Sequence, residues 1–125
     1  MGTELSVDEA VATYGAAWNE TDEEKRRELL TRSFAETGTY VDPTGAADSR
    51  EALVAHIGGF HQMMPGHTID MTSGVDGHGQ LFRFAWAMNN GPEQALEGMD
   101  FVEVDDDGRI SRIVGFFGPF PPAAE

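Results

Sequence analysis

The sequence contains no cysteine and few basic residues. Without cysteine the chain can have no disulfide framework, no thiol nucleophile and no thiolate metal site. Only 8 of the 125 residues are Lys or Arg, against 22 Asp and Glu, so the formal net charge is −14. Because binding to nucleic acid or to an anionic membrane requires a basic surface, this balance predicts neither of them as a partner.

Long apolar runs are also missing from the sequence. No segment approaches the length of a membrane span, and the N-terminal region has no signal-peptide core, so we expect a cytoplasmic protein. The length and the hydrophobic content of 40% fit a single globular domain over residues 1–125. Residues 118–125 are rich in proline, and we expect this tail to lie on the surface or along a partner subunit.

Motifs for several kinds of chemistry are absent as well. The four histidines have no metal-ligand spacing, and His56 and His61 are interpreted as surface or rim residues of a helix. There is no nucleophile elbow, phosphate loop or dinucleotide fingerprint. The sequence therefore predicts no metal and no cofactor, and it makes covalent or nucleotide chemistry a poor fit.

Three helices are predicted in the first half of the chain. A capping box formed by Ser6 and Glu9 begins the first helix. A second capping box, residues 21–24, opens a helix that ends near Ser33. The third is expected over residues 50–61. Each carries one apolar stripe, which predicts that all three pack against a common core.

The remainder of the chain has the period of strands. A short strand ends at Asp42, and four more are expected over residues 67–75, 80–88, 93–104 and 109–117. The last four are separated by three strong hairpin signals, Asp76-Gly77, Asn90-Gly91 and Asp107-Gly108. Helices followed by a curved, mostly antiparallel sheet make an α+β fold, and such a sheet leaves a conical cavity in which chemistry is expected.

Two of the 22 acids do not lie in obvious solvent positions. Asp42 ends a strand after two apolar residues, and Asp100 lies inside a predicted strand. Alternation along that strand places Asp100 on the same face as Leu96 and Val102. If this face lines the cavity, desolvation raises the pKa of Asp100. The alternatives are structural: Asp42 caps a turn, Asp100 points outward, and Tyr14 is an ordinary core residue.

Considered together, several segments resemble the ketosteroid isomerases. They are residues 11–19, Phe34, the strand Thr39-Tyr40-Val41-Asp42-Pro43-Thr44-Gly45, and residues 95–100. More broadly, the sequence is similar to the nuclear-transport-factor-2-like (NTF2-like) superfamily, which includes the SnoaL-type polyketide cyclases. The resemblance spans Ser6 to Phe117. It implies a cone-shaped fold, a small hydrophobic ligand of steroid or polyketide type, and a homodimer joined through an aromatic-rich sheet face.

The resemblance also implies roles for three residues. Asp42 stands where the isomerases have their general base, Tyr14 at their oxyanion tyrosine, and Asp100 at an aspartic acid kept protonated to donate a hydrogen bond. The pKa argument for that acid is taken from the family itself, in which it is a known case. Ile57 departs from the pattern, because the isomerases carry a second tyrosine at that position. The interval from Asp42 to Asp100 is also shorter, so we expect a different cavity mouth.

Six residues are expected to wall the cavity against a flat apolar substrate: Phe34, Ile57, Phe84, Trp86, Phe116 and Phe117. The leading functional hypothesis is an isomerase that moves a proton on a hydrophobic ketone through an enolate or dienolate. A second is a SnoaL-type cyclase, or a related enzyme, with Asp100 as acid and base. A third is a non-catalytic module for ligand binding or dimerisation, since one fold serves many functions.

Overall fold

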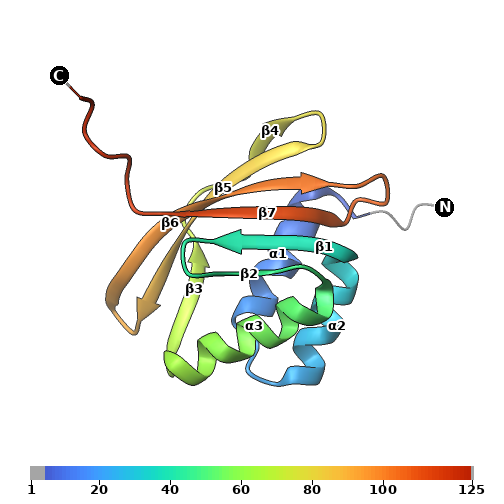
Figure 1. Cartoon of the computed structure of the whole chain (residues 1–125), viewed down its shortest axis with the longest axis horizontal. Coiled ribbons are helices and arrows are strands. Elements are labelled where there is room, and N and C mark those ends of the chain that lie inside the picture. Colours follow the sequence, from blue (N-terminus) through green and yellow to red (C-terminus); the bar gives the residue numbers. More distant parts are fainter. Residues whose placement is uncertain (1–4, 125) are drawn as a thin grey trace.

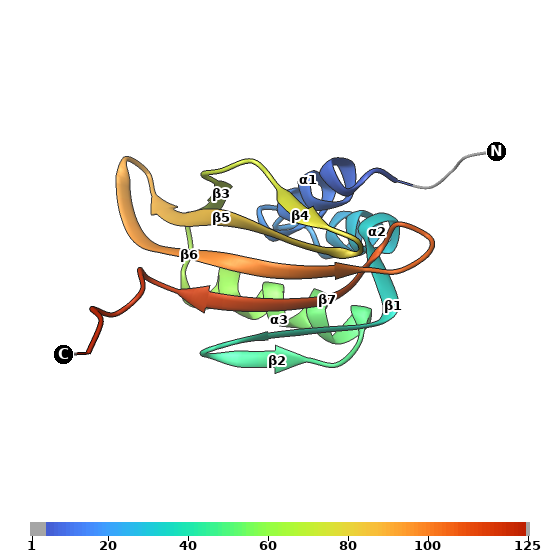
Figure 2. The same ribbon diagram turned by 90° about the horizontal axis from the view of Figure 1, so that it is seen from above.

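The computed structural model describes residues 5–124, in which three helices precede or interrupt a sheet of seven strands (Figure 1). The predicted single domain and its tail therefore extend beyond the described residues at both ends. Figures 1 and 2 show the helices gathered on one side of the sheet, which curves around them. This arrangement confirms the predicted α+β fold. No helix within residues 5–124 is both long and apolar enough to cross a membrane.

The helices are α1 (Val7–Trp18), α2 (Glu23–Ser33) and α3 (Arg50–Met63). The capping box of α1 forms as predicted, with Ser6 and Glu9 bonding each other's backbone amides. The N-cap of α2 is Asp22 rather than Thr21, and its carboxylate accepts the Lys25 amide at 3.0 Å. A carboxylate at this end also interacts favourably with the helix dipole, which explains the one-residue correction.

The strands are β1 (Phe34–Asp42), β2 (Gly45–Ala47), β3 (His67–Met71), β4 (Asp76–His78), β5 (Leu81–Asn90), β6 (Glu93–Val104) and β7 (Ile110–Phe117). Their order in the sheet is β2-β1-β7-β6-β5-β3, and β4 pairs with β5. Only the β1–β7 pair is parallel among the described strands. The sheet is therefore mixed but mostly antiparallel, as expected. Because β1 lies beside β7, the first strand extends the C-terminal meander at its β7 edge.

One predicted hairpin is wrong. Asp76-Gly77 does not form a turn but belongs to β4, and Gly77 pairs with Phe82. The chain reverses at the following residues, where Gly79 has a φ of +61° that favours glycine. The other two signals do mark hairpins, at β5–β6 and at β6–β7. Strand β2 was not predicted, because its three residues are too few to show a strand period.

The core lies between the helices and the sheet. Its fully buried side chains come from every helix and from the central strands, and include Val11, Leu30, Phe34, Leu53, Ile57, Val102, Ile110 and Ile113. After Phe117 the chain continues to residue 124 without a helix or strand, and Figure 1 shows this tail leaving the body of the domain. Phe120 in the tail is 91% exposed.

Candidate functional site

A cavity of about 540 Å³ lies between the sheet and the helices α1 and α3. Most of its wall is apolar, and its polar side chains gather around the end of β1. The lining residues that matter below are Tyr14, Trp18, Tyr40, Asp42, Thr44, His56, Phe84, Trp86, Asp100 and Phe117. No lysine or arginine lines it among the described residues. The predicted cavity is thus present, and both candidate carboxylates line it.

Strand register brings the two carboxylates together. Asp100 on β6 pairs with Gly115 on β7. On its other side β7 pairs in parallel with β1, and Val114 of β7 lies opposite Val41 of β1. Asp42 and Asp100 therefore flank Gly115. A Cβ atom built on Gly115 would lie 3.1 Å from Asp100 Oδ1 and 3.3 Å from Asp42 Cβ. The absence of a side chain at this position lets the two acids face each other across β7.

Asp42 is half-buried and held by four hydrogen bonds. Its Oδ1 accepts from the Thr44 amide at 2.7 Å, from Thr44 Oγ1 at 2.8 Å and from the Gly45 amide at 3.0 Å. Its Oδ2 accepts from the Tyr40 hydroxyl at 2.5 Å. Burial acts to raise the pKa of Asp42, but these donors and the nearby His56 outweigh it and hold the pKa below its ordinary value. Asp42 is therefore a carboxylate at neutral pH.

Asp100 lies in the opposite environment. It is 6% exposed, and Trp86 Nε1 donates to its Oδ1 at 3.0 Å. Burial raises the pKa of Asp100 to about 7; the Trp86 hydrogen bond opposes this rise, and the charge of Asp42 adds to it. Asp100 is therefore protonated to a far greater extent near neutral pH than an exposed aspartic acid, and almost fully at lower pH. A protonated carboxyl group can donate a hydrogen bond into the cavity.

Tyr14 brings a hydroxyl group to the same cavity from α1. Its ring is 2% exposed and stacks on Phe34, with 6.4 Å between the ring centroids. The hydroxyl oxygen is buried and has no hydrogen-bond partner among the described residues. Burial, followed by the charge of Asp100, raises the pKa of Tyr14 well above its ordinary value, so the hydroxyl stays protonated. An unpartnered buried hydroxyl group is costly, and a ligand oxygen would satisfy it.

The chain also has relatives of known family and structure. The family model described as "SnoaL-like domain" matches residues 11–113. The chain belongs to the SnoaL-like family. A crystal structure from Agrobacterium tumefaciens str. C58, described as a candidate isomerase of the SnoaL-like family, is 35% identical; the match covers 88% of this chain and 95% of that one, with a TM-score of 0.83.

Two more distant crystal structures share only the fold. An NTF2-like protein of unknown function from Cytophaga hutchinsonii is 13% identical, with a TM-score of 0.67 over 95% of this chain and 96% of that one. A candidate polyketide cyclase from Sinorhizobium meliloti is 14% identical, with a TM-score of 0.66 over 85% and 92%. No curated protein matches the chain by sequence. The predicted NTF2-like, SnoaL-like membership is confirmed.

The expected wall residues of this SnoaL-like chain divide into two groups. Phe84, Trp86 and Phe117 line the cavity. Phe34 and Ile57 do not, because both are fully buried in the core behind it. Phe116 does not either, because it points to the other face of the sheet and is 53% exposed. Strict alternation from Phe117 accounts for Phe116. Ile57 lies on the inward face of α3, and Phe34 begins β1 with its ring stacked on that of Tyr14.

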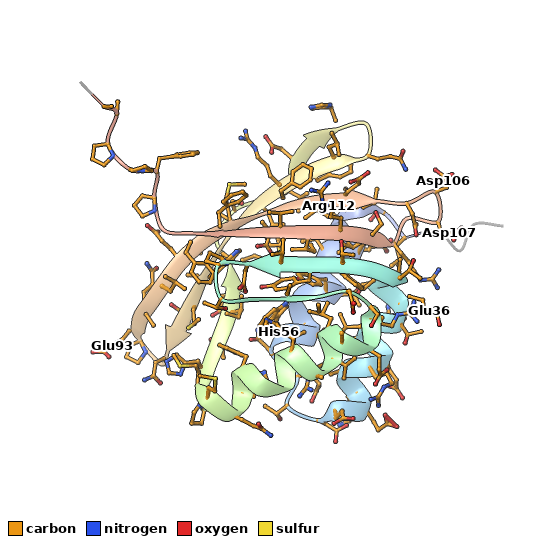
Figure 3. The ribbon with its side chains drawn as sticks, viewed as in Figure 1. Glu36, His56, Glu93, Asp106, Asp107 and Arg112 are labelled. Atoms are coloured by element: carbon orange, nitrogen blue, oxygen red, sulfur yellow. The ribbon has the colours of Figure 1, made fainter. Side chains whose placement is uncertain are left out.

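Tyr40 and His56 are polar lining residues that were not among the candidates. Tyr40 lies two residues before Asp42 on the same strand, so alternation alone places both on one face. His56, which was interpreted as a surface or rim residue, is half-buried on the side of α3 that faces β1, and its ring lies 5.3 Å from that of Tyr40 (Figure 3). The sequence could have indicated this position, because His56 precedes the apolar Phe60 by four residues and residues at that spacing lie on the same face of a helix. Within residues 5–124, no group of His, Asp and Glu gathers as it would around a metal ion.

Proposed function

We propose that this SnoaL-like protein catalyses proton transfer on a hydrophobic ketone through an enolate or dienolate, in the manner of a ketosteroid isomerase. The observation that carries the proposal is the pair of carboxyl groups across Gly115. Their pKa values are shifted in opposite directions, below the ordinary value for Asp42 and to about 7 for Asp100. Titratable groups whose environments separate their pKa values are the signature of an acid and a base at one site.

In the proposed reaction the ketone oxygen lies against Tyr14 and protonated Asp100. Asp42 takes a proton from the carbon next to the carbonyl, and the electron pair of the broken C–H bond moves to the oxygen as an enolate or dienolate. Tyr14 and Asp100 donate hydrogen bonds to this developing charge in a largely apolar cavity, where such donors are most effective. Asp42 then returns the proton to another carbon, so no proton or electron is gained or lost overall.

A decisive test is turnover of a β,γ-unsaturated steroid ketone, followed by the ultraviolet absorbance of the conjugated product. Asp42→Asn should lower kcat by about 10²- to 10⁴-fold, the usual contribution of a general base. Asn keeps the shape of the side chain, and circular dichroism would verify the fold. Equal turnover by the wild type and the variant would contradict the role of Asp42, and no turnover by the wild type would contradict the steroid substrate.

One observation favours a second candidate, a cyclase-type enzyme in which Asp100 itself carries the proton. Both oxygens of Asp42 are already engaged by four donors, whereas Asp100 accepts one hydrogen bond among the described residues. A carboxyl group with a pKa of about 7 can both give and take a proton at neutral pH. In that case Asp42 contributes its charge, and Asp42→Asn would have a smaller effect than loss of Asp100.

Assembly and location remain proposals as well. The face of the sheet that points away from the helices exposes Val41 at 44% and Phe116 at 53%, which supports a homodimer joined through this face. Sedimentation of the wild type and of Phe116→Asp would test the dimer.

A non-catalytic module for ligand binding would bind a phenolic steroid without converting the ketone. The cytoplasmic location stays a prediction from the sequence.

A further inference from the structure

We infer that Tyr40 is a positioning residue for Asp42: its hydroxyl group fixes the carboxylate at the cavity wall and stabilises its charged form. The expected effect of Tyr40 on turnover rests on the proposed function, whereas its effect on the Asp42 carboxylate does not. Tyr40 donates to Asp42 Oδ2 at 2.5 Å, at the short end of hydrogen bonds from a hydroxyl group to a carboxylate. Among the described residues it is the one donor to this oxygen.

The ring of Tyr40 holds the hydroxyl in place. Tyr40 is 6% exposed, and its ring centroid lies 5.7 Å from that of Trp18 and 5.3 Å from that of His56. Helices α1 and α3 thus pack against the ring while β1 carries both Tyr40 and Asp42. A ring confined in this way cannot swing its hydroxyl away from the carboxylate without disturbing the core.

The two oxygens of Asp42 differ in their freedom to react. Oδ1 accepts three donors from the β1–β2 turn, whereas Oδ2 accepts only Tyr40 among the described residues. A carboxylate has about four acceptor positions, so Oδ2 keeps one for an incoming proton. Tyr40 therefore acts on the oxygen that is left to serve as the base. It orients this oxygen and limits its basicity, while its own pKa is raised by burial and by its neighbours, so it stays protonated.

Other groups near Asp42 must be separated from Tyr40 in a test. His56 on α3 favours the charged form of Asp42, and the Thr44 side chain and amide on the β1–β2 turn do the same. Asp100 on β6 faces it across Gly115, and Tyr14 lies on α1 in the same cavity. Tyr40→Phe removes one hydroxyl and leaves all of these groups in place. Tyr14→Phe is the matched control, because it removes a buried hydroxyl that does not bond Asp42.

The experiment measures the pKa of Asp42 directly, by carbon-detected NMR of the labelled carboxyl group during a pH titration. We expect Tyr40→Phe to raise this pKa by about one to two units, since a hydrogen bond to a charged group is lost. Tyr14→Phe should leave it unchanged. The wild type should also show a strongly deshielded Tyr40 hydroxyl proton signal that disappears as Asp42 is protonated, a measurement that needs no folded variant.

The pH profile of kcat/KM on the unsaturated ketone gives the functional readout. If Asp42 must be charged to act, Tyr40→Phe moves the acid limb of the profile upward by the same one to two units. A purely structural role would lower the profile without moving the limb. An unchanged Asp42 titration in Tyr40→Phe would overturn the inference even in an active enzyme. A wild type that converts no ketone would overturn the proposed function, while the carboxyl titration would still decide the role of Tyr40.

Discussion

Asp42 and Asp100 carry the same functional group and flank the same glycine, yet their surroundings are opposite. The backbone and side chain of the β1–β2 turn, together with Tyr40, surround Asp42 with donors. Asp100 lies within a strand, 6% exposed, with the Trp86 indole as its hydrogen-bond donor. Burial acts on both groups in the same direction, so the number of donors decides which of them is charged.

The two environments also depend on each other. The charge of Asp42 is one of the causes that raise the pKa of Asp100. Stabilising one carboxylate therefore favours the neutral form of the other, because two negative charges at such close quarters repel. The site consequently needs strong donors at only one of its acids. Changes to either environment should affect both groups, and three experiments can separate their contributions.

The largest effect is expected in the pH dependence of stability. The pKa of Asp100 is about 7 in the folded protein and near 3.8 when exposed, so between these values the folded state binds more protons. The stability that this group provides is complete below about 3.8 and is lost as the pH rises to about 7. The full change is up to roughly 4 kcal/mol. The pH dependence of the stability that Asp42 provides has the opposite sign, because its pKa is lowered in the folded protein and this stability is lost as the pH falls.

Asp100→Asn should remove this loss, so that urea unfolding shows a flatter dependence of the free energy of unfolding on pH in that window. The other acids are common to both proteins, so the difference between variant and wild type reports the titration of Asp100 together with its effect on Asp42. The Trp86 hydrogen bond can be kept by the amide oxygen. Identical slopes in the two proteins would mean that Asp100 titrates normally, which contradicts the proposed donor.

A somewhat smaller effect is expected on turnover of the ketone. Asp100→Ala removes a donor to the enolate oxygen and should lower kcat by about 10²- to 10³-fold. Asp100→Asn keeps an N–H donor, so it should retain more activity than Asp100→Ala. Its pH profile of turnover should also lose the fall in activity near pH 7 that deprotonation of Asp100 causes in the wild type. If Asp100 instead transfers the proton, the two variants should be equally impaired, because neither alanine nor asparagine can carry it.

Local patterns predicted most of the fold. The capping box of Ser6, the helix expected from residue 50 and two of the three hairpin signals correspond to observed elements. The errors fall where a three-dimensional neighbour decides. Gly77 is in a strand because that strand passes close to Phe82, a contact that the dipeptide itself cannot indicate. The parallel pairing of β1 with β7 joins distant parts of the chain, and no local pattern predicted it.

The site shows the same division. Resemblance named Tyr14, Asp42 and Asp100, and all three line one cavity. It also favoured large apolar residues such as Phe34, whose burial in the core depends on packing and not on residue type. Tyr40 was within the quoted strand, but its importance comes from a hydroxyl–carboxylate distance of 2.5 Å. Atomic distances and the number of hydrogen-bond donors depend on the packed structure, so the composition and residue spacing of the sequence cannot predict them.

The smallest effect is expected from separating the two acids at Gly115. A methyl group in Gly115→Ala would be 3.1 Å from Asp100 Oδ1 and 3.3 Å from Asp42 Cβ, tighter than ordinary packing. Overpacking of this kind costs about 1–3 kcal/mol of stability, and it moves the carboxyl groups apart. The pKa of Asp100 should then fall, because the charge of Asp42 acts from farther away. Gly74→Ala, where a Cβ has no atom within 4 Å, is the control and should change stability by about 0.5 kcal/mol or less. An Asp100 titration that is unchanged in Gly115→Ala would mean that burial alone keeps this acid neutral and that the two carboxyl groups act independently.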